Sequence, residues 1–211
     1  MSIDALAYRL KQNMPWAFQC IEYASTAITV MRHSRRRAAA LGTGTIHGTI
    51  GGSVASIRPL SVEDLGVVSH FFSVLSEDHL RFFHPHSFAE LELQNVLNSK
   101  TRCCYGLYKE DQLVGYCIIK LFPTKNAYCG RVLAPSILGR GLGKFLWQYL
   151  IWQAALMGVT PNATVNRNNL PSIHSLKSIR PDVRYFSIQN DELRVVIPSS
   201  PYDQLLPELC V

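Results

Sequence analysis

Charged residues are scarce in this 211-residue sequence. Only 17% of the residues are Asp, Glu, Lys or Arg, whereas 47% are hydrophobic, a balance typical of a globular chain that buries a sizeable core. The six cysteines include no Cys-x-x-Cys pair and no metal-site spacing. The neighbours Cys103 and Cys104 would point to opposite faces of a strand. We therefore expect reduced core cysteines in place of a disulfide framework, and no metal site.

Long hydrophobic runs are also missing. The longest low-charge stretch near the start, AFQCIEYASTAITVM, has fifteen residues and contains Glu22, so it is too short and too polar to span a bilayer. The charged region and the cleavage site of a secretory signal are not visible either. The sequence predicts no membrane span and a cytoplasmic location.

Acidic residues are fewest at the start of the chain. Residues 1–52 carry six Lys or Arg against two Asp or Glu, whereas the remaining residues carry fifteen against thirteen. A near-neutral body behind a basic front is not typical of a nucleic-acid-binding protein, so no nucleic-acid partner is expected. The triple arginine 35–37 is interpreted as a solvated segment, with contact to phosphates or to an acidic membrane surface as the alternative.

Periodicity is absent from residues 35–56, which are rich in Ala, Gly and Thr and are interpreted as a linker. We therefore divide the chain into a basic N-terminal extension with its Gly/Thr linker, residues 1–52, and a domain, residues 53–211. The extension is expected to be helical or disordered and dispensable for the fold. Limited proteolysis should then cut first between Arg35 and Ser53.

From residue 54 onward the pattern alternates between strands and helices, with no internal repeat. A short strand is followed by Ser61, an N-cap with Asp64 three residues later, before an apolar helix. A hairpin is expected to turn at 110–112 and another at Asn190-Asp191. Expected strands are 54–60, 102–110, 113–122, 127–134, 163–166 and the arms of the hairpin in 183–198; expected helices are 65–75, 88–98, 144–157 and 170–179. The order indicates an α/β fold with a mixed sheet.

Three glycines fall within five positions, Gly139, Gly141 and Gly143, directly before one of these helices. Glycine costs backbone entropy, so the cluster indicates either a tight turn or a nest of N–H groups for an anion at a helix N-terminus. A dinucleotide-binding loop needs a different glycine spacing and a parallel βαβ start. A Walker loop needs Ser or Thr after the lysine, and this chain has Phe145 there.

The run Leu133-Ala134-Pro135-Ser136-Ile137-Leu138-Gly139-Arg140-Gly141-Leu142-Gly143 resembles the pyrophosphate loop of the GNAT superfamily of acyl-CoA-dependent N-acetyltransferases. The resemblance covers roughly residues 54–197. It implies a mostly antiparallel sheet flanked by helices, and acetyl-CoA as co-substrate, its diphosphate held by the N–H groups of residues 139–144. It implies these cofactor-binding residues: Leu133, Ala134, Pro135, Leu138, Gly139, Arg140, Gly141, Leu142, Gly143, Lys144 and Asn169.

Two positions depart from the family pattern. Leu138 stands where the family has Gln or Arg, so Arg140 and Lys144 are expected to supply the charge. The segment NLPSIHSL matches the helix whose Asn contacts the pantetheine arm, here Asn169, but Leu176 stands where the family often has its tyrosine acid. The general acid is therefore left unassigned. The polarising backbone N–H of the family maps to Leu133 or Ala134.

The proton acceptor is predicted among the histidines of RFFHPHSF, residues 81–88. His84 and His86 flank the stiffening Pro85 in the segment that forms the acceptor-side wall in the family, and neutral imidazole suits proton removal near neutral pH. They are our candidate catalytic residues, with Tyr128 and Cys129 as alternatives. Proton loss to water is a further alternative. Two histidines alone do not make a metal site.

The resemblance implies an N-acetyltransferase acting on a primary amine of a small molecule or an amino sugar, with protein amines as an alternative. A second class, an acyl-CoA-binding sensor without turnover, is favoured by Leu176. A protein-interaction module that uses the basic front is a third. The oligomeric state stays open, a dimer included.

Overall fold

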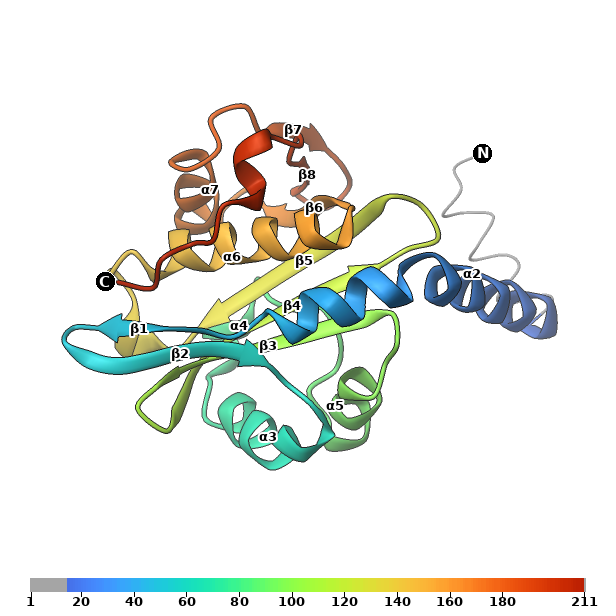
Figure 1. Cartoon of the computed structure of the whole chain (residues 1–211). Helices are drawn as coiled ribbons and strands as arrows, with labels where there is room; N and C mark the ends of the chain where they lie inside the picture. Colours follow the sequence, from blue (N-terminus) through green and yellow to red (C-terminus); the bar gives the residue numbers. More distant parts are fainter. Residues whose placement is uncertain (1–14, 211) are drawn as a thin grey trace.

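The computed structural model describes residues 15–210, which form an eight-stranded sheet with helices on both faces (Figure 1). The strand order is β1-β2-β3-β4-β5-β6-β8-β7, and every pairing is antiparallel except β5 with β6. The strands are β1 (Ile46–Ile50), β2 (Ser53–Pro59), β3 (Arg102–Lys109), β4 (Gln112–Leu121), β5 (Asn126–Leu133), β6 (Thr160–Asn166), β7 (Arg184–Ser187) and β8 (Glu192–Val196). The expected mixed, mostly antiparallel sheet is confirmed.

Helices cover the two faces of the sheet and enclose a core on each. One core lies under α6 and α7, the other under α3 and α5 (Figure 1). The helices are α2 (Pro15–Gly42), α3 (Leu65–Ser73), α4 (Glu77–Leu80), α5 (Glu90–Leu97), α6 (Leu142–Met157) and α7 (Leu170–Lys177), with 3-10 turns η1 (Val62–Asp64), η2 (Pro135–Ile137) and η3 (Pro201–Gln204). Of the helices formed by residues 15–210, none has the length and hydropathy that a membrane crossing requires.

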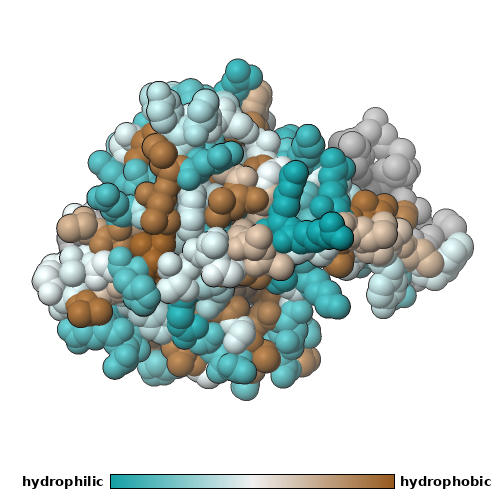
Figure 2. Space-filling view, in the orientation of Figure 1, coloured by the Kyte–Doolittle hydropathy of each residue, from teal (hydrophilic) through white to brown (hydrophobic). Residues whose placement is uncertain are grey.

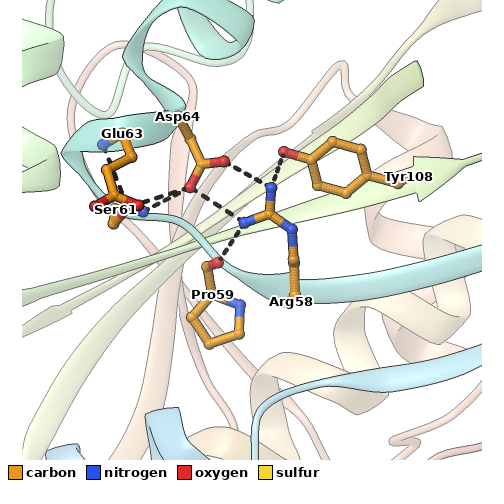
Figure 3. Close-up of polar contacts among 6 residues, drawn as sticks. All are labelled: Arg58, Pro59, Ser61, Glu63, Asp64 and Tyr108. Carbon is orange, nitrogen blue, oxygen red and sulfur yellow. Dashed lines mark hydrogen bonds and ion pairs between the residues drawn. The ribbon is translucent and has the colours of Figure 1, made fainter. Parts of the chain in front are cut away.

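The junction of β2 with α3 shows why the chain turns there. The Ser61 side chain accepts a hydrogen bond from the Glu63 N–H, and Asp64 accepts one from the Ser61 N–H at 2.9 Å. Arg58 of β2 donates to both carboxylate oxygens of Asp64 (2.6 and 3.1 Å) and to the Tyr108 hydroxyl (3.0 Å) (Figure 3). The predicted N-cap is therefore also the anchor that ties η1 to the sheet.

Turn residues lie where the sequence predicts them. Glu110 begins the turn between β3 and β4 with a φ of 55°, and Asn190 and Asp191 have φ values of 59° and 58° between β7 and β8. Two consecutive left-handed residues match the right-handed twist of a hairpin. Gly158 caps α6 in the left-handed conformation.

The linker prediction does not hold for residues 46–50, which form β1. These residues pair antiparallel with β2, and Ile46 and Ile50 are buried. Thr49 donates its N–H to the Leu209 carbonyl (2.9 Å), and Gly48 faces Leu209 with no space for a side chain. Cross-strand pairing and packing thus order a segment whose Gly/Thr composition predicts a coil. The proposed boundary at 52/53 falls inside the β1–β2 hairpin.

Helix α2 also packs on the domain. Ala40 belongs to the core under α6, and Arg37 donates to the carbonyls of Ser99 (3.1 Å) and Arg102 (3.0 Å). Further toward the start of α2, hydrophobic residues reach the surface among hydrophilic ones (Figure 2). Residues 1–14 of the predicted extension lie outside the described residues.

Candidate active site

The sheet is split between β5 and β6. The two strands pair only through Asn126–Tyr128 of β5 and then diverge. On the other side of β5, Ala134 donates its N–H to the Val114 carbonyl (2.8 Å). Because N–H and C=O groups alternate in direction along an antiparallel strand, those of Cys129, Arg131 and Leu133 face the gap. His79 of α4 accordingly donates to the Leu133 carbonyl (2.7 Å).

Two cavities meet at this split. The larger, here called the charged cavity, has a volume of about 350 Å³ and lies on the side of residues 81–85. The smaller, here called the inner cavity, has a volume of about 50 Å³ and lies toward α6 and α7. Both are lined by Phe82, Phe83, Cys129, Gly130 and Thr164. A molecule entering from either face would therefore reach the same point of β5.

The glycine loop forms a row of N–H groups at the start of α6. Gly139 and Gly141 adopt φ values of 77° and 76°, and a side chain at Gly139 would meet nothing within 4 Å. Lys144 donates its N–H to the Gly141 carbonyl (2.8 Å). The N–H groups of residues 139–143 have no partner among the described residues. Five such groups at the positive end of a helix are suited to receive an anion.

The other predicted loop residues surround this nest. Pro135 opens η2, and Leu138 is 52% exposed at its end, so its apolar side chain brings no charge to the loop. Arg140 and Lys144 are both exposed. The Arg140 guanidinium lies beside Gly51 in the β1–β2 turn. Charge from Arg140 therefore reaches the loop from the side of that turn.

Arg131, which sequence reasoning missed, places a cation beneath the loop. A side chain at Gly143 would lie 3.2 Å from its guanidinium, which packs on the Trp147 ring and donates to the Ser175 hydroxyl (2.6 Å). Its buried Nε has no partner, and no carboxylate within residues 15–210 pairs with it. Burial lowers the pKa of Arg131 to about 10. The position lacks a counter-ion, which an anion in the loop would supply.

Asn169 lines the inner cavity, as the resemblance implies. It caps α7, and its side-chain oxygen accepts the Ser172 N–H (3.3 Å). Leu176 is buried in the same lining. Tyr185 of β7, a second residue that the sequence did not indicate, also lines this cavity, and its buried hydroxyl has no partner in the described part of the chain. Burial raises its pKa, so the hydroxyl keeps its proton.

The two candidate histidines lie in different surroundings. His84 is exposed and lines the charged cavity. His86 is half-buried among aromatic rings, with Nδ1 bonded to the Ser87 carbonyl (2.8 Å) and Nε2 to the Tyr116 hydroxyl (3.1 Å). Burial, more than the nearby Arg102, lowers the pKa of His86. Its neutral form is favoured, but both nitrogens are engaged.

The structure also places the two alternative catalytic groups that the sequence analysis named. Tyr128 and Cys129 both line the charged cavity, and burial raises the pKa of the Cys129 thiol well above its ordinary value. Such a thiol is a poor base and a poor nucleophile. Glu192 of β8 also lines this cavity, and its carboxylate accepts a hydrogen bond from Asn166 (3.1 Å). The sequence could not indicate it, because β8 lies beyond the split strands.

Comparison with known proteins identifies the family. Residues 69–178, just over half of the chain, match the model of the acetyltransferase (GNAT) family. Comparison with curated protein sequences gives no match.

Several solved structures share the fold at low identity. The GNAT domain of S. lividans PAT is 14% identical over 73% of this chain and 96% of its own, with a TM-score of 0.64. The PaiA N-acetyltransferase of Thermoplasma acidophilum, in complex with coenzyme A, is 16% identical over 69% and 99%, with a TM-score of 0.55. Spermidine N-acetyltransferase of Vibrio cholerae, in complex with CoA and spermine, is 15% identical over 68% and 94%, with a TM-score of 0.54. With the family model spanning the split strands and the glycine loop, the chain belongs to the GNAT acetyltransferase family.

Proposed function

We propose that the protein is an acetyl-CoA-dependent N-acetyltransferase that modifies a primary amine of a small molecule. The observation that carries this proposal is the meeting of the two cavities at Cys129 and Gly130. A thioester in the inner cavity and an amine in the charged cavity would be side by side there. Holding two reactants in contact supplies most of what this transfer needs.

The loop and the inner cavity fit coenzyme A. The five unpaired N–H groups and the uncompensated cation of Arg131 suit its diphosphate. Asn169 and the gap-facing N–H groups of Arg131 and Leu133 suit the amide carbonyls of the pantetheine arm, whereas the Leu133 carbonyl is bonded to His79. Pro135 and the remaining loop residues hold the backbone shape of the nest. The neighbours crystallised with CoA support the same assignment.

The chemistry then follows from the groups around the split. Bound acetyl-CoA supplies an acetyl thioester. The gap-facing N–H of Cys129 lies where the two cavities meet and polarises the thioester carbonyl, whereas Leu133 lines neither cavity. The acceptor nitrogen forms the new C–N bond while the C–S bond breaks.

Two protons move in this transfer. The acceptor amine gives one to His84, the exposed base of the charged cavity. His86 is the second candidate, and must first release one of its bonded nitrogens. The thiolate takes a proton from the Tyr185 hydroxyl, which lines the inner cavity where Leu176 offers none.

The competing function is an acyl-CoA-binding sensor without turnover. Leu176 and the engaged nitrogens of His86 favour it. It shares the cofactor site and differs in the absence of an acceptor reaction.

Calorimetry with coenzyme A tests the cofactor site. Gly141→Asp would put a carboxylate into the nest and should weaken binding by about 100-fold or more. Gly66→Asp is the control, because Gly66 is exposed in α3, on the opposite face of the sheet, with nothing within 4 Å of an added side-chain carbon. Equal affinity in Gly141→Asp and the parent protein would refute the loop assignment.

Thiol release from acetyl-CoA with a panel of primary amines tests turnover. Amine-dependent release that is weaker in His84→Gln, with coenzyme A affinity unchanged, is the expected result. Tight coenzyme A binding with no release for any amine would instead establish the sensor.

A further inference from the structure

The charged cavity is lined by three cations and one carboxylate. Arg81, Arg102 and Lys120 come from the α4 side, β3 and β4, and Glu192 comes from β8. Polyamines and other multiply cationic amines would meet repulsion from this lining. The positive side of the cavity thus points to an acceptor with negative charge.

Arg102 and Lys120 lie directly opposite each other in the β3–β4 ladder. Like charges at directly opposite cross-strand positions are destabilising, and here Arg102 is partly buried while Lys120 is exposed. Burial, followed by the proximity of Arg102, lowers the pKa of Lys120. The fold therefore bears a cost at this pair, which an anion between the two side chains would remove.

The carboxylates near these cations do not neutralise all of them. Arg81 pairs with Asp78 at 2.8 Å, and Arg102 lies 3.6 Å from Glu92. Lys120 makes no ion pair within residues 15–210, and only the Phe122 ring approaches its Nζ, at 5.4 Å from the ring centroid. Glu22 of α2 faces Lys120 only at long range. Of the three cations, Lys120 is therefore the one that no carboxylate within residues 15–210 pairs with.

The lone carboxylate lies at the opposite side of the cavity. Strands β5 and β6 lie between β4 and β8 in the sheet. The split between β5 and β6 falls between them. Glu192 suits the ammonium form of an arriving acceptor. Arg102 and Lys120 suit an anionic group on the other side of the split.

We propose that the acceptor carries an anionic group, a carboxylate or a phosphate, which Lys120 and Arg102 bind while its amine faces Gly130 at the split. This inference rests on the proposed function and names its substrate class. It separates the protein from acetyltransferases of polyamines. The anionic group lies on the β3–β4 side of the reacting nitrogen.

The test compares acceptors matched in all but the anion. Glucosamine 6-phosphate is paired with glucosamine, and glutamate with glutamine, with spermidine as the cationic extreme. Thiol release gives kcat/KM for each, and calorimetry on the coenzyme A-loaded protein gives binding without turnover. In at least one pair the anionic member should be preferred by about tenfold or more. The glucosamine pair tests for a phosphate and the glutamate pair for a carboxylate, so the comparison shows which anionic group the cavity binds.

Variants assign that preference to Lys120. Lys120→Gln should reduce the anionic-to-neutral ratio by about tenfold, and Lys120→Glu should reverse it. Lys109→Gln, at the other end of β3 and outside the cavity lining, should leave the ratio unchanged. Glucosamine 6-phosphate or glutamate binding that depends on Lys120, without any turnover, would support the inference while refuting the proposed enzyme. Equal use and equal binding of both members of each pair, or a ratio unmoved in Lys120→Gln, would overturn the inference.

Discussion

Arg131 is the residue whose surroundings are hardest to explain without a ligand. Its guanidinium contacts the Trp147 ring and the Ser175 hydroxyl, and within residues 15–210 its Nε has no partner and no carboxylate pairs with it. A buried charge without a partner is costly, and removing it often leaves a protein as stable or more stable. The same charge lies next to the first turn of α6, where an incoming diphosphate would lie. We propose that Arg131 compensates for the leucine at position 138.

Arg131→Met tests this role. The substitution keeps an unbranched side chain of similar reach, so the free energy of unfolding of the unliganded protein should be unchanged or higher. Coenzyme A affinity should fall by about 10- to 100-fold, the size of one strong charge-assisted contact. Arg140→Gln, at the exposed loop position, is the control and should have a smaller effect. Unchanged affinity in Arg131→Met, measured by calorimetry, would contradict the assignment.

His86 predicts how stability depends on pH. Burial holds its pKa below the ordinary 6.5, so the unfolded chain binds the proton at a higher pH than the folded chain. The contribution of His86 to the free energy of unfolding is then fully present above pH 6.5. It is lost as the pH falls from 6.5 to the pKa of His86 in the folded protein. In His86→Gln the decrease in the free energy of unfolding between about pH 7.5 and about pH 5 should be smaller than in the parent protein. Urea unfolding at both pH values measures it, and His174→Gln, at an exposed position, should behave like the parent. If the free energy of unfolding decreases equally in His86→Gln and in the parent protein, His86 is not the group responsible.

At the residue scale, the sequence predicted the candidate site residues that belong to continuous motifs. The glycine loop and Asn169 form continuous motifs, and the structure puts them at a helix start and beside the inner cavity. The sequence did not indicate Arg131, Tyr185 and Glu192, because the local pattern around each is that of an ordinary strand residue. Only the split of the sheet brings them to the site, and that pairing is not readable from one sequence.

Among the elements, α2 and β1 depart furthest from expectation. Composition around residues 35–56 favours a flexible connection, whereas the chain forms the end of a long helix and a sheet strand there. The residue pattern did not predict β1, because this strand is stabilised by pairing with β2 and by a contact with Leu209, which lies far away in the sequence. From β2 to β8 most strands and helices agree with the predicted order, since their hydrophobic patterns and turn residues are strong.

This packing reverses the expected proteolysis result. Trypsin should cut slowly after Arg35, Arg36 and Arg37, although three basic residues in a row offer ideal sites, because Arg37 is bonded to β3 and cleavage needs local unfolding. Cleavage at Lys125 or Arg140, in exposed loops, should come first. Mass spectrometry of early fragments measures the order.

Ala40→Glu supplies the control for that prediction. A charge at this buried position should loosen the end of α2 and open the triple arginine to trypsin, whereas Ala38→Glu, at an exposed position, should not. Fragments that begin within 36–38 in the parent protein, ahead of any loop cleavage, would show that the extension is loosely attached.

For the whole molecule, the two cavities set the order of chemical events. In the proposed function the two substrates would reach the split from opposite sides. Cys129, whose thiol would lie between them, is a poor nucleophile because burial raises its pKa. We expect direct transfer within a complex of both substrates, with intersecting double-reciprocal plots. Cys129→Ala should retain kcat within about tenfold. Parallel plots together with loss of turnover in Cys129→Ala would indicate an acetylated cysteine instead.

The contact between Gly48 and Leu209 has a consequence for how copies of this protein meet one another. An outer strand of a sheet offers unpaired N–H and C=O groups, on which a second chain can add a strand. Here the segment at Leu209 and Cys210 lies along part of β1 and occupies those groups. Gly48→Ala would push a methyl group into the Leu209 carbonyl and dislodge the tail. The uncovered β1 edge should then drive concentration-dependent self-association, visible by light scattering, in a protein whose core loses the buried Leu209 side chain.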